Sequence, residues 1–158
     1  MKTEQNPITG REELGDIKTP VQALVQFYYA FNRRDLKTMS QNWLQSPESE
    51  MDNPLGGIKR GWAEIEPVYR SIFEGTARVE VEFYDYTIHE TPEFFYAVGR
   101  ERGTLRLPTG EALSLAIRTS RIFRRVNGVW KQVHHHGSID DPKLLERYQA
   151  AVLKKPNA

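Results

Sequence analysis

Hydrophobic and polar residues follow two different periods along this chain, and the change falls near residue 78. Before that point apolar residues recur at helical spacing, which predicts helices beginning at Thr19 and at Asp35 and a third over about 62–74. Thr19, Pro20 and Gln22 form the capping box and first-turn proline that are typical of a helix start. Residues 45–61 are rich in proline and glycine and are predicted to be a loop.

Beyond residue 78 the pattern is that of β-strands, predicted over 78–90, 94–107, 112–126 and 129–138. Asn127-Gly128 between two apolar runs indicates a hairpin, and an amphipathic helix is predicted over 141–154. Helices followed by long strands favour an α+β fold, with a curved, cone-shaped antiparallel sheet wrapped around three N-terminal helices. We expect a flexible lead over 1–18, one domain over 19–140, and a C-terminal helix and tail over 141–158.

Composition narrows the class of protein. The chain has 158 residues, a net charge of +1 and no cysteine, which predicts one domain without disulfides, thiolate metal sites or cysteine nucleophiles. A charge so near zero argues against a nucleic-acid partner. No apolar run approaches the roughly 18 residues of a membrane helix. The first 18 residues lack the apolar core of a signal peptide, so a cytoplasmic protein without a membrane partner is expected.

The charge is unevenly distributed, since residues 94–136 carry eight basic and only two acidic side chains. With Asn127-Gly128 as the turn, Arg121 is predicted to face His134, and Thr119 to face His136. With Thr109-Gly110 as the preceding turn, Arg100 pairs with Thr119. These registers gather one polar cluster on a single face: Arg100, Arg102, Thr119, Arg121, His134 and His136. A slip of one residue would scatter it.

Guanidinium groups at the mouth of a cone would bind a carboxylate or phosphate. They would also depress the pKa of a nearby histidine and keep it neutral, ready to accept a proton. The alternative is that the same groups line the outer face of the sheet or a contact between subunits.

Three stretches resemble the nuclear transport factor 2-like superfamily, which includes SnoaL-like cyclases, ketosteroid isomerase and scytalone dehydratase. They are FYYAFNRRDL, DNPLGGIKRGWAEI and RIFRRVNGVWKQVHHHGS, within residues 27–36, 52–65 and 121–138. The last is similar to the end of the association domain of calcium/calmodulin-dependent protein kinase II and its stand-alone bacterial relatives. The resemblance implies a pocket for small carboxylates lined by Arg121 and by Arg100 or Arg102.

The resemblance also implies which enzyme this chain is not. Ketosteroid isomerase has an Asp base, a Tyr on the first helix and a protonated Asp. The corresponding places hold Asn53, Phe27 and about Arg121 or Ile122. We therefore expect no steroid isomerase of that design.

Three functions remain open, each without a cofactor or a metal. The first is a binding protein for a small, anionic ligand, and the second an isomerase, dehydratase or cyclase in which Asp52 or His134 acts as the base. The third is an assembly module, with a homodimer formed through an outer row of Ile122, Val126 and Val133. The candidate ligand-binding residues are Arg121, Arg100, Arg102, His134, His136, Thr119, Tyr28 and Trp62. Asp52 has an alternative role as a loop cap, and His134 with His136 is a poor cation site beside arginines.

Overall fold

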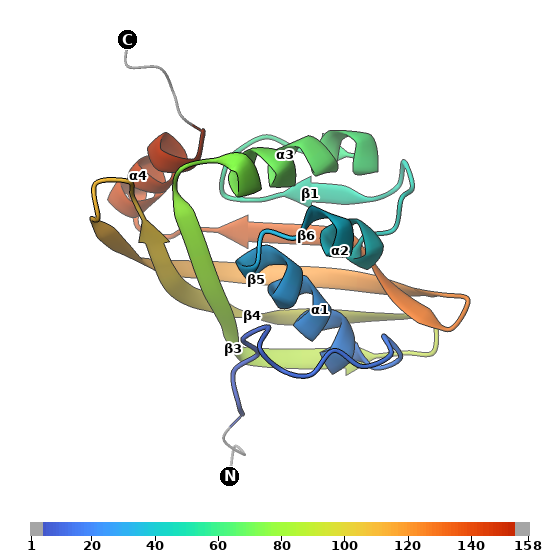
Figure 1. The fold of residues 1–158 in the computed structure, drawn as a ribbon. Helices are drawn as coiled ribbons and strands as arrows, with labels where there is room; N and C mark the ends of the chain where they lie inside the picture. The colour runs from blue at the N-terminus through green and yellow to red at the C-terminus, as the bar shows by residue number, and fades with distance from the viewer. Residues whose placement is uncertain (1–4, 154–158) are drawn as a thin grey trace.

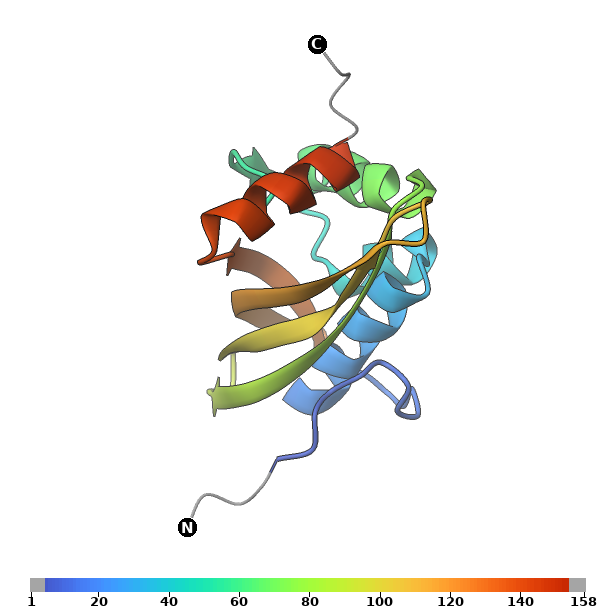
Figure 2. The same ribbon diagram turned by 90° about the vertical axis from the view of Figure 1, so that its left-hand side faces the viewer.

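The computed structural model describes residues 5–153 and confirms the α+β fold. One curved sheet of six strands wraps around the helices in the order β2-β1-β6-β5-β4-β3 (Figures 1 and 2). The sheet is mixed, because β1 runs parallel to β6 whereas all other neighbours are antiparallel. The elements are α1 (Pro20–Asn32), α2 (Leu36–Asn42), β1 (Glu50–Asp52), β2 (Lys59–Arg60), α3 (Trp62–Glu74), β3 (Arg78–Glu90), β4 (Phe94–Arg106), β5 (Ala112–Val126), β6 (Val129–Ser138) and α4 (Pro142–Leu153).

The helix starts follow the local signals in the sequence. Thr19 and Gln22 form the predicted capping box at α1, and the Asp35 side chain accepts a hydrogen bond from the Thr38 backbone N–H at 3.0 Å at the start of α2. The short strands β1 and β2 were not predicted, since they lie within the stretch expected to be loop. They extend the sheet beyond β6, so residues 50–52 enter the same layer as the long strands.

The described part of the N-terminal lead packs onto the domain. Ile8 is buried and exchanges two backbone hydrogen bonds with Phe83 on β3. Gly10 has a φ of +81°, and a Cβ there would lie 2.5 Å from the backbone of Tyr28. Residues on both sides of the boundary expected after residue 18 therefore pack together in the structure. The flexibility of the lead stays a prediction.

The core fills the space between the concave face of the sheet and α1, α2 and α3. Phe95 and Phe123 stack with ring centroids 4.6 Å apart, and Trp130 meets Phe95 edge-on at 5.0 Å. Among residues 5–153, no helix is long and apolar enough to cross a membrane.

The predicted register of the β5–β6 hairpin is right near its turn and wrong beyond it. Val126 pairs with Val129 and Phe123 with Gln132 as expected, but a β-bulge then inserts Val133. Arg121 consequently faces His135. The bulge lies where the chain that follows α2 packs alongside β6. There Trp43 forms an isolated β-bridge with Gln132, and the Leu44 N–H donates to the Gln132 carbonyl at 2.9 Å.

The predicted β4–β5 register is also wrong, by one residue. The connection is a five-residue loop that contains a turn over 107–110, so Arg106 pairs with Ala112. Glu101 therefore faces Ile117, and Arg100 pairs with Arg118. Because side chains alternate across a sheet, this shift turns Arg100 and Arg102 to the outer face.

Candidate functional site

Only part of the predicted polar cluster lies inside the cone. Arg121, Thr119 and Tyr28 are buried on the concave side. Trp62 is partly buried at the start of α3, packed against the core. The other four predicted members face outward, contrary to the sequence prediction, because both strand registers differ from the predicted ones. They are Arg100, Arg102, His134 and His136.

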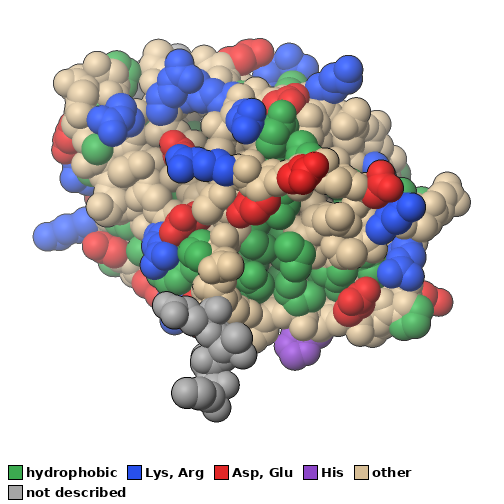
Figure 3. All heavy atoms as spheres, turned by 60° about the horizontal axis from the view of Figure 1, so that its bottom comes forward, with side chains coloured by type: hydrophobic (Ala, Val, Ile, Leu, Met, Phe, Trp, Pro, Cys, Tyr) green, Lys and Arg blue, Asp and Glu red, His purple; other side chains and the backbone are tan. Residues whose placement is uncertain are grey.

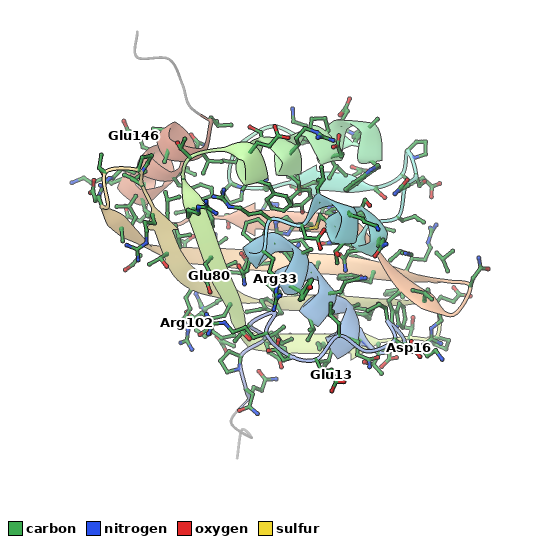
Figure 4. The ribbon with its side chains drawn as sticks, viewed as in Figure 1. Glu13, Asp16, Arg33, Glu80, Arg102 and Glu146 are labelled. Carbon is green, nitrogen blue, oxygen red and sulfur yellow. The ribbon has the colours of Figure 1, made fainter. Side chains whose placement is uncertain are left out.

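Most arginines of the sheet form ion pairs with carboxylates from other parts of the chain. On the outer face, Arg100 lies 3.2 Å from Asp85 and Arg102 lies 2.7 Å from Glu82. Arg118, Arg124 and Arg125 have acidic partners as well. Figure 3 shows basic and acidic side chains interspersed around an apolar area on one face of the molecule. In Figure 4, Arg102 lies near Glu80 along β3, well below α3 and α4.

Arg121 is the centre of the cone interior. Its guanidinium is 1% exposed, donates to the Glu101 carboxylate at 2.9 Å and donates to the Gln132 side chain at 2.8 Å. The Tyr28 hydroxyl donates to the same Glu101 oxygen at 2.8 Å. Arg121 also lies over the Phe27 ring, 3.5 Å from its centroid. The buried cation is thus held by one carboxylate, one amide and an aromatic face.

Glu101 is the functional residue that the sequence prediction missed. It is the only acidic side chain of β4, flanked by two arginines, and strict alternation places it on the face opposite to theirs. That isolated acidic residue in a basic strand was the available signal. The one-residue register error concealed it, because it assigned the inner face to Arg100 and Arg102.

Several buried donors in the cone have no hydrogen-bond partner. The indole N–H of Trp43, the hydroxyl of Tyr69 and the Nε–H of Arg121 are all buried and unpaired. The Tyr69 hydroxyl is flanked by Trp43 and Arg121, whose N–H groups lie outside strict hydrogen-bond geometry. Burial raises the pKa of Tyr69 to about 12, and the charge of Arg121 and weak hydrogen bonding from Trp43 and Arg121 oppose that rise. Thr119 Oγ1, also buried and unpaired, lies on the adjoining part of β5.

A small cavity of about 30 Å³ adjoins two of these groups, Arg121 and Tyr69, whereas Trp43 and Thr119 are not part of its lining. Its polar lining includes Arg121, Glu101, Tyr69 and His135, and most of the remaining lining is apolar: Phe27, Phe31, Ile72, Val79, Val81, Ile117 and Tyr148 with Asn53 and Pro54. A cavity of this size holds no more than one or two water molecules.

His135 occupies the inner position that the sequence prediction gave to His134. Its Nδ1 lies 3.4 Å from the Ser120 carbonyl, so Nδ1 carries the proton and Nε2 is left as an acceptor. Burial, followed by the positive charge of Arg121, holds the pKa of His135 well below the ordinary histidine value. The imidazole is therefore neutral near pH 7.

Asp52, His134 and His136 form a separate cluster on the outer face. Asp52 lies 2.7 Å from His136 Nδ1 and 3.8 Å from His134 Nε2. Within the described part of the chain, no group of three or more acidic, histidine or cysteine side chains could hold a metal ion. Because Asp52 and His134 lie on the outer face, they do not reach the cavity. A base inside the cone would have to be another residue.

Comparison with known proteins agrees with this architecture. A model of the SnoaL-like domain matches residues 21–142, and the chain belongs to this family. Among solved structures, the fold is similar to a provisionally assigned calcium/calmodulin-dependent protein kinase type II association domain from Thiobacillus denitrificans. That pair has a TM-score of 0.66 and 26% identity over 80% of this chain and 99% of the other.

Two further structures share the fold. A provisionally assigned dehydratase of the NTF2-like family from Streptomyces avermitilis has a TM-score of 0.65 and 22% identity, covering 73% of this chain and 90% of its own. A ketosteroid isomerase-like protein from Erwinia carotovora atroseptica has a TM-score of 0.63 and 23% identity, covering 84% and 99%. No curated protein matches the chain. The nuclear transport factor 2-like assignment made from the sequence is confirmed.

Proposed function

We propose that this protein binds a small organic molecule in the cone through a carbonyl-type oxygen. The observation that carries the proposal is the set of three buried, unpaired donors on Arg121, Tyr69 and Trp43. An unpaired buried donor costs about 1–3 kcal/mol, so an acceptor oxygen beside these groups would be stabilised. The adjoining cavity is lined mainly by apolar groups, which suits a carbon skeleton, but at about 30 Å³ it must widen before such a ligand can enter.

The charge of the ligand follows from Glu101. The prediction of an anionic ligand depended on several unpaired cations facing the cone, whereas Arg121 is paired with Glu101 at 2.9 Å. A carboxylate bound here would leave one uncompensated negative charge in a buried site, which is costly. We therefore narrow the proposed ligand to one whose acceptor group is neutral, such as a ketone or an amide.

Benzamide and benzoate, which share a shape and differ in charge, test both parts of this proposal. We expect benzamide to bind more tightly than benzoate in isothermal titration calorimetry at pH 7. Tyr69→Phe and Trp43→Phe should each weaken benzamide binding by roughly three- to tenfold, the value of one hydrogen bond. Tyr96→Phe, which removes a hydroxyl on the outer face, is the matched control. Unchanged affinity in both inner variants would refute the proposal.

A second candidate function is cofactor-independent acid–base catalysis, favoured by the neutral His135 on the cavity wall. The donors that hold a carbonyl oxygen would also stabilise negative charge that develops on it. His135 Nε2 would then accept a proton from the neighbouring carbon. In D2O, the wild-type protein should accelerate deuterium exchange at the methyl group of 4′-hydroxyacetophenone, and His135→Gln should not. Binding without exchange would remove this candidate and leave the first.

The proposed assembly is a homodimer formed through the outer face of the sheet. Tyr96 and Ile122 pair directly across β4 and β5, and Phe94 and Val98 flank them; all four are at least 36% exposed. A row of exposed apolar groups on a sheet suits a second copy of the same surface. Sedimentation equilibrium should show a dimer for the wild type and a monomer for Val98→Glu. A monomeric wild type would contradict the assembly.

A further inference from the structure

The mouth of the cone is closed by the chain's own C-terminal helix. Figure 2 shows α4 lying across the open end of the curved sheet, alongside α3. Of the side chains of α4 that the structure describes, only Tyr148 lines the cavity. It is 4% exposed, although most of α4 is exposed or half-buried.

Tyr148 reaches the polar centre of the cone. Burial, and then the negative charge of Glu101 and the neighbouring Tyr69, raise the pKa of Tyr148 far above its ordinary value. The ring shares the cavity lining with Phe27, Phe31 and Tyr69. The phenol of Tyr148 thus lines the same cavity as Arg121, and the space that remains admits only water.

Few side chains of the twelve-residue helix α4 are fully buried. These are Tyr148 and Val152, while Leu144, Leu145 and Ala151 are partly buried and pack against the core. Its polar attachments include an exposed ion pair between Arg147 and Glu111, and a hydrogen bond from the Gln149 side chain to the Pro54 carbonyl at 2.9 Å. Exposed ion pairs contribute little to stability, so separation of α4 from the cone is opposed mainly by the burial of its apolar side chains.

We propose that Tyr148 occupies the position of the ligand's ring, so that the cone accepts a single-ring aromatic compound only when α4 withdraws. This inference rests on the proposed function, because the same donors on Arg121, Tyr69 and Trp43 would hold the acceptor group of that compound. The aromatic side chains in the cavity lining, Phe27, Phe31 and Tyr69, favour an aromatic ring over a saturated one. Tyr148 is therefore both a competitor of the ligand and the residue that selects its shape.

Calorimetry with benzamide tests the inference on the full chain. Tyr148→Ala and Val152→Ala should each raise the affinity for benzamide, by at least tenfold for Tyr148→Ala, while Tyr148→Phe should bind as the wild type does. Val152→Ala is decisive because it loosens α4 and leaves the Tyr148 ring intact. Cyclohexanecarboxamide, with the same amide on a saturated ring, should bind at least tenfold more weakly than benzamide. In the wild type, benzamide should accelerate hydrogen exchange of the backbone amides of α4.

Each contrary result has its own meaning. Equal affinity in wild type and Tyr148→Ala, without faster exchange in α4, would overturn the role of Tyr148 and leave the proposed function intact if Tyr69→Phe still weakens binding. A gain in Tyr148→Ala alone would mean that the substitution created a new cavity, which also overturns the inference. Binding of cyclohexanecarboxamide as tight as that of benzamide would refute the aromatic ligand class. No binding of benzamide to any variant would refute the proposed function and this inference together.

Discussion

The buried pair of Glu101 and Arg121 should respond asymmetrically to removal of either partner. The two side chains are 8% and 1% exposed and lie 2.9 Å apart. Glu101→Gln leaves a buried guanidinium that cannot lose its proton, and such an uncompensated charge costs about 3–5 kcal/mol. Arg121→Met instead leaves a carboxyl that can become neutral by binding a proton, so its cost should depend on pH.

The sign of that pH dependence can be worked out in advance. Without its cation, the buried Glu101 carboxyl is favoured in its neutral form. The folded state of Arg121→Met then binds the proton more tightly than the unfolded state does. Its stability relative to the wild type should therefore be greatest at acidic pH and should fall as the pH rises.

Urea unfolding followed by circular dichroism at 25 °C measures these effects. At pH 7 we expect a loss of about 3–5 kcal/mol for Glu101→Gln, and for Arg121→Met a smaller loss at pH 5 than at pH 8. The double variant should recover much of the loss, because no buried charge remains. The control is Glu82→Gln, whose partner Arg102 lies 2.7 Å away on the exposed face; it should cost about 0–1 kcal/mol. Equal losses in Glu101→Gln and Glu82→Gln would refute the reasoning.

Three other predictions concern stability. The pKa of His135 is lowered in the folded state, so the unfolded state binds a proton there more readily and stability should fall as the pH drops below about 6.5. In unfolding measured between pH 5 and 8, His135→Gln should flatten this dependence. Gly10→Ala should lower the free energy of unfolding by more than about 2 kcal/mol, since its Cβ would lie 2.5 Å from the backbone of Tyr28. Gly110 has a similar φ but open space around it, so Gly110→Ala should cost only about 1 kcal/mol. Equal costs in the two variants would contradict the clash at Gly10. Thr19→Ala should cost about 1 kcal/mol through loss of the α1 cap, and no change in thermal denaturation would contradict that role.

The sequence was a good guide wherever a few neighbouring residues decide the conformation. The capping box at Thr19, the hairpin at Asn127-Gly128 and the alternation of the four long strands were predicted correctly. Each depends on local dihedral preferences or on the two-residue period of a strand. The fold class could be inferred from the order of these elements, and the family from the resemblance of three stretches of sequence to known members.

The composition of the site depended on tertiary structure. Whether Arg100 or Glu101 faces the cone is decided by a shift of one residue in the pairing of two strands, and whether His134 or His135 does so is decided by the bulge at Val133. Neither is encoded within a single strand, because register depends on loop length and on what packs against the partner strand.

The sequence by itself therefore determined the helices, the four long strands and the presence of an arginine candidate for the site on β5. Only the tertiary structure decided that Arg121 is paired with Glu101, that three donors remain unpaired around Tyr69, and that Tyr148 closes the cavity. The physical reason is distance along the chain. These side chains come from the residue that follows α2 and from α3, β4, β5 and α4, and they meet only once the sheet has curved around the helices.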